Sequence, residues 1–382
     1  MPPTPPGWSD FRAVFGSAYD GWEFYSTLTV DREQVIRYHP APSPSSPALV
    51  KDASYAGTQI DADALYFITA HEGDRAPYFL QVAPYAPHAR VNPKPHYAGD
   101  PLFPSAFQDR PGPGRRDGNC GPLRCRSLTG RDLRGFGDPQ RDNRPRRFDG
   151  SPALAWNENP SVLRSATAVE ALPDRARMAQ SAPTDDHPDP GVGRPRHLLG
   201  RDVRQRLPPR PTGLAMGTGT AYTTDSRVPL LVVGPGVAPG PRREMVSNLD
   251  LAPTFEALAS LADRKAAERD YVFLEHTRSG ASAEDPDRTP ELDTIPSYVA
   301  VRSRTRLLIR LDLDRGPRTR YGWELYDLAR DRFERTNVYG RGDYADDVRV
   351  LQRKLRQLDD CSSATRNDPV RDDCRTLAED RN

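Results

Sequence analysis

The chain has 382 residues and a formal net charge of +1, with 54 Lys and Arg against 53 Asp and Glu. This balance excludes a strong overall attraction to nucleic acid or to an anionic membrane, so partners have to be inferred from particular sites. No apolar run approaches the ~18–20 residues of a membrane span, and the opening MPPTPPGW lacks the basic and apolar regions of a signal peptide.

Proline and cysteine usage give two further indications. The 40 prolines are about twice the ordinary share of roughly 5%, which indicates that part of the chain packs poorly. The four cysteines form two close pairs, Cys120 with Cys125 and Cys361 with Cys374. Such pairs suit local disulfides in an exported protein, and four buried free thiols are the alternative. The sequence itself carries no localisation signal.

The first regular pattern predicts a helix in SYAGTQIDADALYFITAHEG, residues 54–73. Ile60, Ala64, Phe67 and Ile68 recur at helical spacing, and Gly73 stands at the end. The next run, APYFLQVAPYAPHAR at residues 76–90, predicts a short buried strand that leads into a loop carrying His88. In open α/β sheets ligands bind beyond the carboxyl ends of strands, so this loop is a candidate site.

Between about 105 and 213 the chain shows no regular period, and clear elements return after it. Alternation, apolar runs and caps predict strands in RVPLLVVGPGV (227–237), YVFLEH (271–276), SYVAVRSRTRLLIRLDLD (297–314, two strands) and WELYDLARDRFERTNVYG (323–340), and helices in SNLDLAPTFEALASLAD (247–263) and at 344–359. The last strands predict an antiparallel sheet. The chain therefore reads as α/β followed by a small C-terminal α+β subdomain.

Five segments carry a resemblance to a known family. GWSDFRAVFGSAYDGWEFYST, YAGTQIDADALYFITAHEGDRAPYFLQVAPYAPHAR, GTAYTTDSRVPLLVVGPGVAPG, VSNLDLAPTFEALASLA and WELYDLARDRFERTNVY resemble, in order and at approximate spacing, successive blocks of a bacterial sulfatase of the alkaline-phosphatase-like superfamily. The resemblance covers most of 7–182 and 214–361. It implies an α/β fold with a mixed sheet flanked by helices, incomplete here, in a domain of residues 1–289 and a C-terminal subdomain of residues 290–382.

The resemblance also implies a chemistry. Sulfatases hydrolyse sulfate esters, including those of sulfated glycans, with a formylglycine made from Cys or Ser, and they are often exported. A divalent cation, usually Ca²⁺, is held by Asp and Asn oxygens, which suits a hard ion. Lys and His side chains bind the sulfate, where developing negative charge needs fixed donors.

Several of these parts are not expected in this chain. The family's nucleophile motif, Cys or Ser followed by x-Pro-x-Arg, and its first Asp pair lie N-terminal to the block at which this sequence begins. Cys120 and Cys125 lie in NCGPLRC, which lacks that context. We therefore assign no residue as nucleophile and none as metal ligand, and we expect that this chain neither carries formylglycine nor binds Ca²⁺.

His88 is the site residue that the resemblance carries over. APYAPHAR is similar to the family's Pro-His loop, in which the His contacts the sulfate. The alternative is a purely structural role, in which His88 only caps a turn of the loop. The family's sulfate-binding Lys falls at Thr218, where a neutral hydroxyl cannot supply the cation. His71, His96 and His276 lack a paired ligand spacing and are interpreted as surface or core residues.

The family's second metal motif, Ser-Asp-Asn-Gly, is expected shortly before Thr218, but the chain has DVRQRLPP at 202–209. If codons are read one base later, residues 202–206 can encode Thr-Ser-Asp-Asn-Gly and 196–201 can encode a strand-like Asp-Thr-Tyr-Leu-Val-Val. The hypothesis is that about 183–213 is translated out of frame, and we expect this stretch to be disordered or non-native. Arg204 and Arg206 then stand where cation ligands belong.

The sequence thus predicts a sulfuric ester hydrolase by family whose activity is impaired. One alternative is a non-catalytic protein that binds sulfated glycans, and another is a phosphodiesterase or phosphatase of the same superfamily. A nucleic-acid-binding arm in the Arg-rich stretch 110–213 is disfavoured because acidic residues are interspersed and aromatic residues do not interleave. The substrate and the oligomeric state are not specified.

Overall fold

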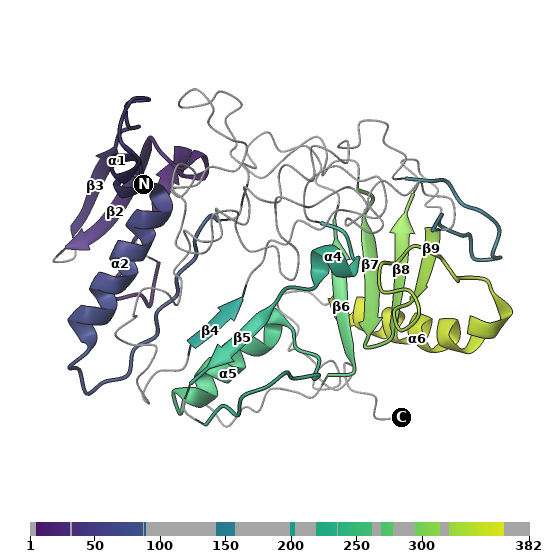
Figure 1. Cartoon of the computed structure of the whole chain (residues 1–382). Helices are drawn as coiled ribbons and strands as arrows, with labels where there is room; N and C mark the ends of the chain where they lie inside the picture. The colour runs from purple at the N-terminus through teal and green to yellow at the C-terminus, as the bar shows by residue number, and fades with distance from the viewer. Residues whose placement is uncertain are drawn as a thin grey trace. The chain divides into compact units, whose positions relative to one another are not determined.

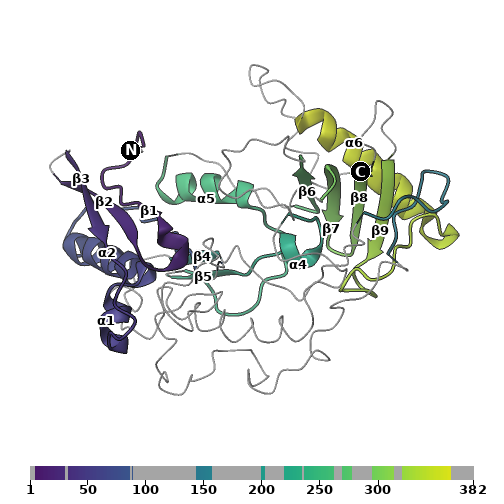
Figure 2. The same ribbon diagram turned by 90° about the horizontal axis from the view of Figure 1, so that it is seen from above.

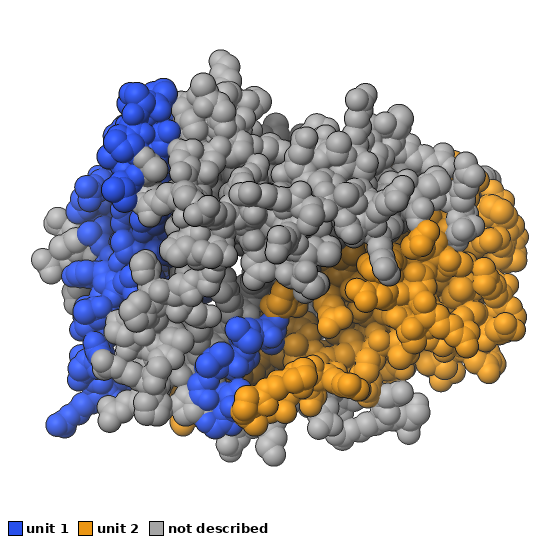
Figure 3. All heavy atoms as spheres, in the orientation of Figure 1, with its two compact units in different colours: residues 1–132, 165–201, 230–237 blue, residues 133–164, 202–229, 238–382 orange. Residues whose placement is uncertain are grey.

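The structure is a computed structural model of the whole chain. It describes residues 5–30, 33–86, 88, 143–156, 199–202, 219–234, 236–261, 269–277, 295–313 and 321–362 (Figure 1). The chain divides into two compact units (Figure 3). Unit 1 comprises residues 1–132, 165–201 and 230–237, and unit 2 comprises residues 133–164, 202–229 and 238–382. Within the described ranges, no helix is long and apolar enough to cross a membrane.

Unit 1 begins with a three-stranded antiparallel sheet in the order β1-β2-β3. Its strands are β1 (Val14–Gly16), β2 (Phe24–Val30) and β3 (Glu33–His39). Between β1 and β2 lies a short 3-10 helix, η1 (Ser17–Asp20). Phe24 is fully buried and packs with Ala18 and Ala56, which anchors the start of β2 to the following helix.

Two helices follow the sheet, α1 (Ala48–Ala53) and α2 (Ala56–His71). The helix predicted for 54–73 is confirmed in α2. The backbone N–H of Ala56 donates to the Gly21 carbonyl at 2.8 Å, and the indole N–H of Trp22 donates to the Lys51 carbonyl at 3.0 Å. Trp22 and Tyr55 are both buried and in contact. These bonds tie the last turn of α1 and the first residue of α2 to the segment that precedes β2.

The strand predicted within residues 76–90 is wrong: residues 76–86 form no regular element. The apolar side chains of this run are not buried as a strand of a covered sheet would be, since Phe79 is 52% exposed. Pro77 and Pro84 also lack the N–H groups that a strand inside a sheet donates. The run instead reaches the Pro-His loop as an irregular segment.

The strand predicted for residues 227–237 is confirmed as β5 (Leu230–Val233), which pairs with β4 (Leu199–Asp202) in a two-stranded sheet. β5 is not a buried strand, because each of its four side chains is at least 40% exposed. β4 lies inside the stretch 183–213 for which an out-of-frame origin is our hypothesis. The rest of that stretch lies outside the described residues, and the hypothesis stays a prediction.

Unit 2 is built on a four-stranded antiparallel sheet in the order β6-β7-β8-β9 (Figure 1). The strands are β6 (Tyr271–His276), β7 (Tyr298–Ser303), β8 (Arg306–Asp312) and β9 (Tyr321–Asp327). The sheet is followed by η6 (Gly342–Tyr344) and α6 (Ala345–Ser362). The predicted C-terminal α+β arrangement is therefore confirmed. Its first strand, β6, precedes residue 290, and the predicted domain boundary at 289–290 stays a prediction.

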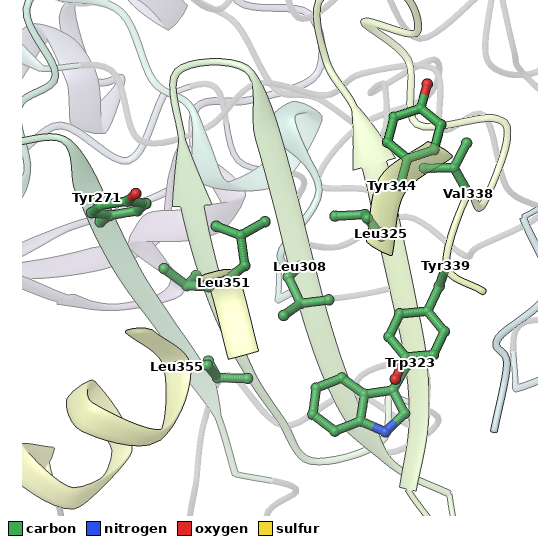
Figure 4. Packing of buried hydrophobic residues seen from close by; sticks show 10 residues of the cluster. Tyr271, Leu308, Trp323, Leu325, Val338, Tyr339, Tyr344, Leu351 and Leu355 are labelled. Atoms are coloured by element: carbon green, nitrogen blue, oxygen red, sulfur yellow. The ribbon is translucent and has the colours of Figure 1, made fainter. Parts of the chain in front are cut away.

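Both faces of this sheet are buried. On one face, α6 packs across the strands (Figures 2 and 4), and Leu351 and Leu355 of the helix join Val301, Leu308 and Leu325. The other face holds a second cluster, formed by Ala221, Tyr222, Ile295, Tyr298, Ala300, Leu307, Ile309, Leu311 and Tyr326. Apolar residues at successive positions of a strand point to opposite faces, so the run in β8 fills both clusters.

The helix predicted for residues 247–263 is confirmed as η4 (Asn248–Asp250) followed by α5 (Leu251–Leu258). Ser247 caps it: its side chain accepts from the Leu249 N–H, and its own N–H donates to Asp250 at 2.7 Å. Asp250 also pairs with Arg269 at 2.7 Å. A further turn, α4 (Thr223–Ser226), precedes β5.

Candidate functional site

His88, the site residue expected from sequence, is held in unit 1 by a turn and by edge-to-face ring contacts. Its backbone N–H donates to the Tyr85 carbonyl at 2.9 Å, which closes the turn at the end of the irregular run. Its imidazole lies 4.6 Å from the Tyr19 ring, centre to centre, with 70° between the two planes. The side chain is partly buried, so solutes still reach it.

Tyr19 contacts a second ring, that of Tyr85, at 4.3 Å and 61°. The Tyr85 hydroxyl donates to the Val14 carbonyl at 2.5 Å. Burial, together with the nearby Tyr19, raises the pKa of Tyr85 to about 12, so the hydroxyl remains a donor at neutral pH. We call Tyr19, Tyr85 and His88 the aromatic bracket. It connects the Pro-His loop to β1 and η1.

The local sequence explains why Tyr19 reaches this position. Gly16 and Gly21 flank η1 with φ of 75° and 89°, in a region that residues with a Cβ rarely adopt. These two glycines allow the chain to turn sharply before and after one short helix. Ala18 is buried against Phe24, and this packing sets the rotation of η1. Tyr19 is the next residue along.

The bracket can present one imidazole to a bound anion. An imidazole N–H donates to sulfate or phosphate oxygens, most strongly when the ring is protonated. Among the described residues, no three His, Cys, Asp or Glu side chains gather as a metal site. We therefore derive no chemical step through a metal.

Thr218, the other expected position, lies outside the described residues, and the segment that follows it makes several hydrogen bonds. The Gly219 carbonyl accepts from the Tyr298 hydroxyl at 3.0 Å. Thr220 donates to Asp225 through its N–H at 3.1 Å and its hydroxyl at 2.5 Å. This segment is thereby attached to the sheet of unit 2.

A buried carboxylate that the sequence analysis missed lies under this segment. Glu324 of β9 has no exposed surface, and it accepts from the Tyr222 and Tyr326 hydroxyls, each at 2.8 Å, and from the Trp156 indole at 3.2 Å. Burial raises its pKa to about 7, against the effect of the three donors. The sequence WELYD could have indicated this position. In a strand, Glu324 lies on the same face as Tyr326 and on the opposite face from Trp323 and Leu325.

A second buried carboxylate, Glu334, binds the next residue of the segment. It accepts from the backbone N–H of Thr223 at 2.9 Å and from the Thr223 hydroxyl. Arg302 donates to the same hydroxyl at 2.8 Å and lies 3.9 Å from Glu334. Burial raises the pKa of Glu334. The two glutamates thus hold α4 on the sheet, which is a structural role.

The other residues singled out from sequence are not brought together as a site in the described ranges. His71 is exposed and pairs with Asp74 at 2.6 Å, and His276 stacks on Tyr298 at 5.6 Å, in line with the interpretation of both as surface or core residues. Cys361 forms a disulfide, and the other three cysteines lie outside the described residues, as does His96.

No protein-family model matches the sequence, and no curated protein matches it significantly. Among solved structures, the chain resembles BT4656, determined in complex with its substrate D-glucosamine-2-N,6-O-disulfate, with a TM-score of 0.52 and 14% identity over 97% of this chain and 79% of that one. It matches a phosphonate monoester hydrolase of Agrobacterium radiobacter with a TM-score of 0.44 and 17% identity, over 84% of this chain and 62% of the other.

A third match, BT1596, is described as a 2-O GAG sulfatase and has a TM-score of 0.32 at 17% identity, over 54% of this chain and 44% of that one. At 14% identity the likeness to BT4656 concerns the fold, and the chain spans about four-fifths of that protein's length. The fold class expected from the sequence is thereby confirmed. The chain shares the α/β fold of BT4656.

Proposed function

We propose that this protein recognises sulfate esters of sugars through the loop that carries His88, and that it does not hydrolyse them. The observation that carries the proposal is the aromatic bracket. It holds a partly buried imidazole in a fixed orientation on a sulfatase-type fold. A donor that is already oriented loses less conformational freedom when an anion binds, and this favours recognition.

The proposed ligand is a sulfated amino sugar. BT4656, whose fold the chain shares, was determined with a glucosamine that bears an N-sulfate and a 6-O-sulfate. A sulfate group offers three oxygens that accept hydrogen bonds, and the imidazole of His88 supplies one donor. The sugar contacts would come from other parts of the chain, and we assign no residue to them.

We expect no turnover because of the residues found at two places in the sequence. A neutral Thr218 stands where the resemblance places a sulfate-binding Lys, so one fixed positive charge is lost. In the frame hypothesis, Arg204 and Gln205 stand where the Asp and Asn of the second metal motif are expected, and a guanidinium group repels a metal ion. Without these groups the developing negative charge of the transition state is poorly stabilised.

Two assays on the full chain test the proposal. In the first, 2-N,6-O-disulfated glucosamine is titrated into wild-type protein, His88→Ala and the matched control His71→Ala, and binding is followed by calorimetry. Loss of a charge-assisted hydrogen bond of about 1.5–3 kcal/mol weakens binding by about 10- to 150-fold in His88→Ala. The His71→Ala control, which removes a surface imidazole paired with Asp74, binds like wild type.

In the second assay, sulfate release from the same sugar is measured after co-expression with formylglycine-generating enzyme, in the presence of Ca²⁺. We expect no release above background. Release over many turnovers contradicts the absence of catalysis, and failure of the wild-type chain to bind contradicts recognition. Equal or tighter binding of the 6-phosphorylated sugar redirects the assignment to phosphate esters.

A further inference from the structure

We propose that Tyr19 is a positioning residue for His88: it orients the imidazole toward the bound sulfate without touching the ligand itself. This inference rests on the proposed function and extends it to a residue that the sequence analysis did not select. Tyr19 is the one member of the aromatic bracket that contacts both of the other rings. It lies in η1, on the far side of α1 and α2 along the chain from the Pro-His loop.

The ring geometry is the first argument. The Tyr19 plane stands at 70° to the imidazole and at 61° to the Tyr85 ring, with centroid distances of 4.6 Å and 4.3 Å. Edge-to-face pairs at such distances are attractive beyond the effect of the area that they bury. Tilting the imidazole plane about its Cβ–Cγ bond would disrupt the contact with Tyr19, so this contact selects the plane in which the ring lies.

The anchoring of the bracket is the second argument. Tyr85 is fixed at its hydroxyl by the Val14 carbonyl and at its backbone carbonyl by the His88 N–H. Tyr85 also packs against the buried cluster of Ala18, Phe24 and Ala56. Tyr19 therefore contacts the imidazole on one side and, on the other, a ring that is anchored at two points. The orientation of His88 is determined by the fold of unit 1 rather than by the loop alone.

A pre-oriented imidazole also lowers the free-energy cost of binding. Immobilising a side chain on binding costs about 0.5–1.5 kcal/mol, and a ring that is already oriented avoids this cost. Replacing Tyr19 by Leu keeps an apolar side chain and removes the flat surface. We therefore expect Tyr19→Leu to weaken binding of the disulfated glucosamine by about 2- to 12-fold. Tyr19→Phe keeps the ring and binds like wild type.

Two readouts separate positioning from a general structural effect. The first is nuclear magnetic resonance relaxation of the His88 ring in protein labelled with ¹³C-histidine. Tyr19→Leu broadens or averages the His88 signal in the absence of ligand, whereas Tyr19→Phe does not. The second is a double-mutant cycle with His88→Ala. If Tyr19 acts through His88, Tyr19→Leu has no further effect on affinity once the imidazole is gone.

Controls keep the outcomes distinct. Tyr66→Leu removes an exposed tyrosine of α2 and leaves both readouts unchanged. Tyr85→Phe keeps the ring contacts of Tyr19 with residue 85 and with His88, and it removes only the hydrogen bond to Val14. It therefore tests the bracket even if Tyr19→Leu does not fold. We expect a twofold to threefold loss of affinity, which corresponds to the loss of one weak hydrogen bond. Its His88 signal broadens less than that of Tyr19→Leu.

The inference is overturned if Tyr19→Leu binds like wild type, if its His88 signal is unchanged, or if the effects of Tyr19→Leu and His88→Ala simply add. Lack of binding by the wild-type chain is a different result, because it defeats the proposed function. The relaxation measurement on the unliganded protein then still decides whether Tyr19 orders the imidazole.

Discussion

In the described residues, none of the hydrogen-bond partners of the Glu324 carboxylate is a cation. Three neutral donors, Tyr222, Tyr326 and Trp156, bind its two oxygens, and the residue is fully buried. The Tyr326 hydroxyl has a second acceptor, the Asn143 carbonyl, at 3.4 Å. A protonated Glu324 can therefore donate to one hydroxyl while Tyr326 turns to Asn143, so both protonation states have partners.

This arrangement predicts a pH-dependent stability. The folded pKa of Glu324, about 7, lies above its ordinary value of 4.5. The folded state thus holds a proton that the unfolded state releases, and stability falls as the pH rises from about 4.5 to about 7, by about 3 kcal/mol from this group. We expect Glu324→Gln to abolish that decrease. The measurement is the free energy of unfolding in urea at pH 4.5, 6 and 8 for both proteins.

The matched control is Glu275→Gln, at an exposed position of β6, the strand at the opposite edge of the same sheet. Its stability should follow the wild-type pH dependence, because this variant retains Glu324. Parallel curves for wild type and Glu324→Gln would contradict the prediction. The quantity to compare is the difference in unfolding free energy between wild type and Glu324→Gln at each pH. Burial also raises the pKa of Asp61 to about 7, and Asp61 contributes equally to the pH dependence of both proteins.

At the scale of single elements, α5 continues η4, which begins at the reciprocal cap of Ser247 and Asp250. Replacing an N-cap serine by alanine costs about 1 kcal/mol. We expect Ser247→Ala to increase amide exchange about fivefold across 251–258, the residues of α5. Ser45→Ala, at an exposed serine outside any helix, is the control and leaves these amides unchanged. A rate unchanged in Ser247→Ala would show that tertiary packing alone sets the start of the helix.

Elements with a local signal could be predicted from the sequence. α2, α5 and α6 have helical spacing or caps, and β6 to β9 have apolar alternation, because one face or both faces of each are buried. The hairpin of β2 and β3 was missed. Ser26, Thr27 and Thr29 dilute its alternation, and Asp31-Arg32 between the strands lacks the Gly or Asn that marks a tight turn.

The candidate site was predictable in part. His88 could be selected because the Pro-His loop has a recognisable sequence. Its partner Tyr19 could not, since the contact joins η1 to a loop beyond two helices, and no spacing rule links them. The same reason hid the bond between Tyr222 and Glu324, which are 102 residues apart. The strand predicted within residues 76–90 was wrong for a different reason: an apolar run is compatible with a strand but does not require one.

At the scale of the whole molecule, burial is unequal between the two units. In unit 2, Leu307, Leu308 and Ile309 of β8 are at most 2% exposed, because each face of the sheet is covered. In unit 1, Val35 and Tyr38 of the edge strand β3 are 50% and 47% exposed. The cooperative stability of the protein should therefore lie in the C-terminal sheet, since buried apolar area is the main favourable contribution to folding.

Hydrogen exchange followed by mass spectrometry tests this distribution. We expect amides of β7, β8 and β9 to exchange at least about 10³-fold more slowly than those of β3 and β5, after correction for intrinsic rates, because only global unfolding exposes the former. Raising the urea concentration to just below the transition provides an internal control: exchange in β8 accelerates steeply, whereas exchange in β3 and β5 barely changes, because local opening exposes little surface. Equal protection of β5 and β8 would contradict the expectation and would mean that the exposed strand β5 unfolds only together with the C-terminal sheet.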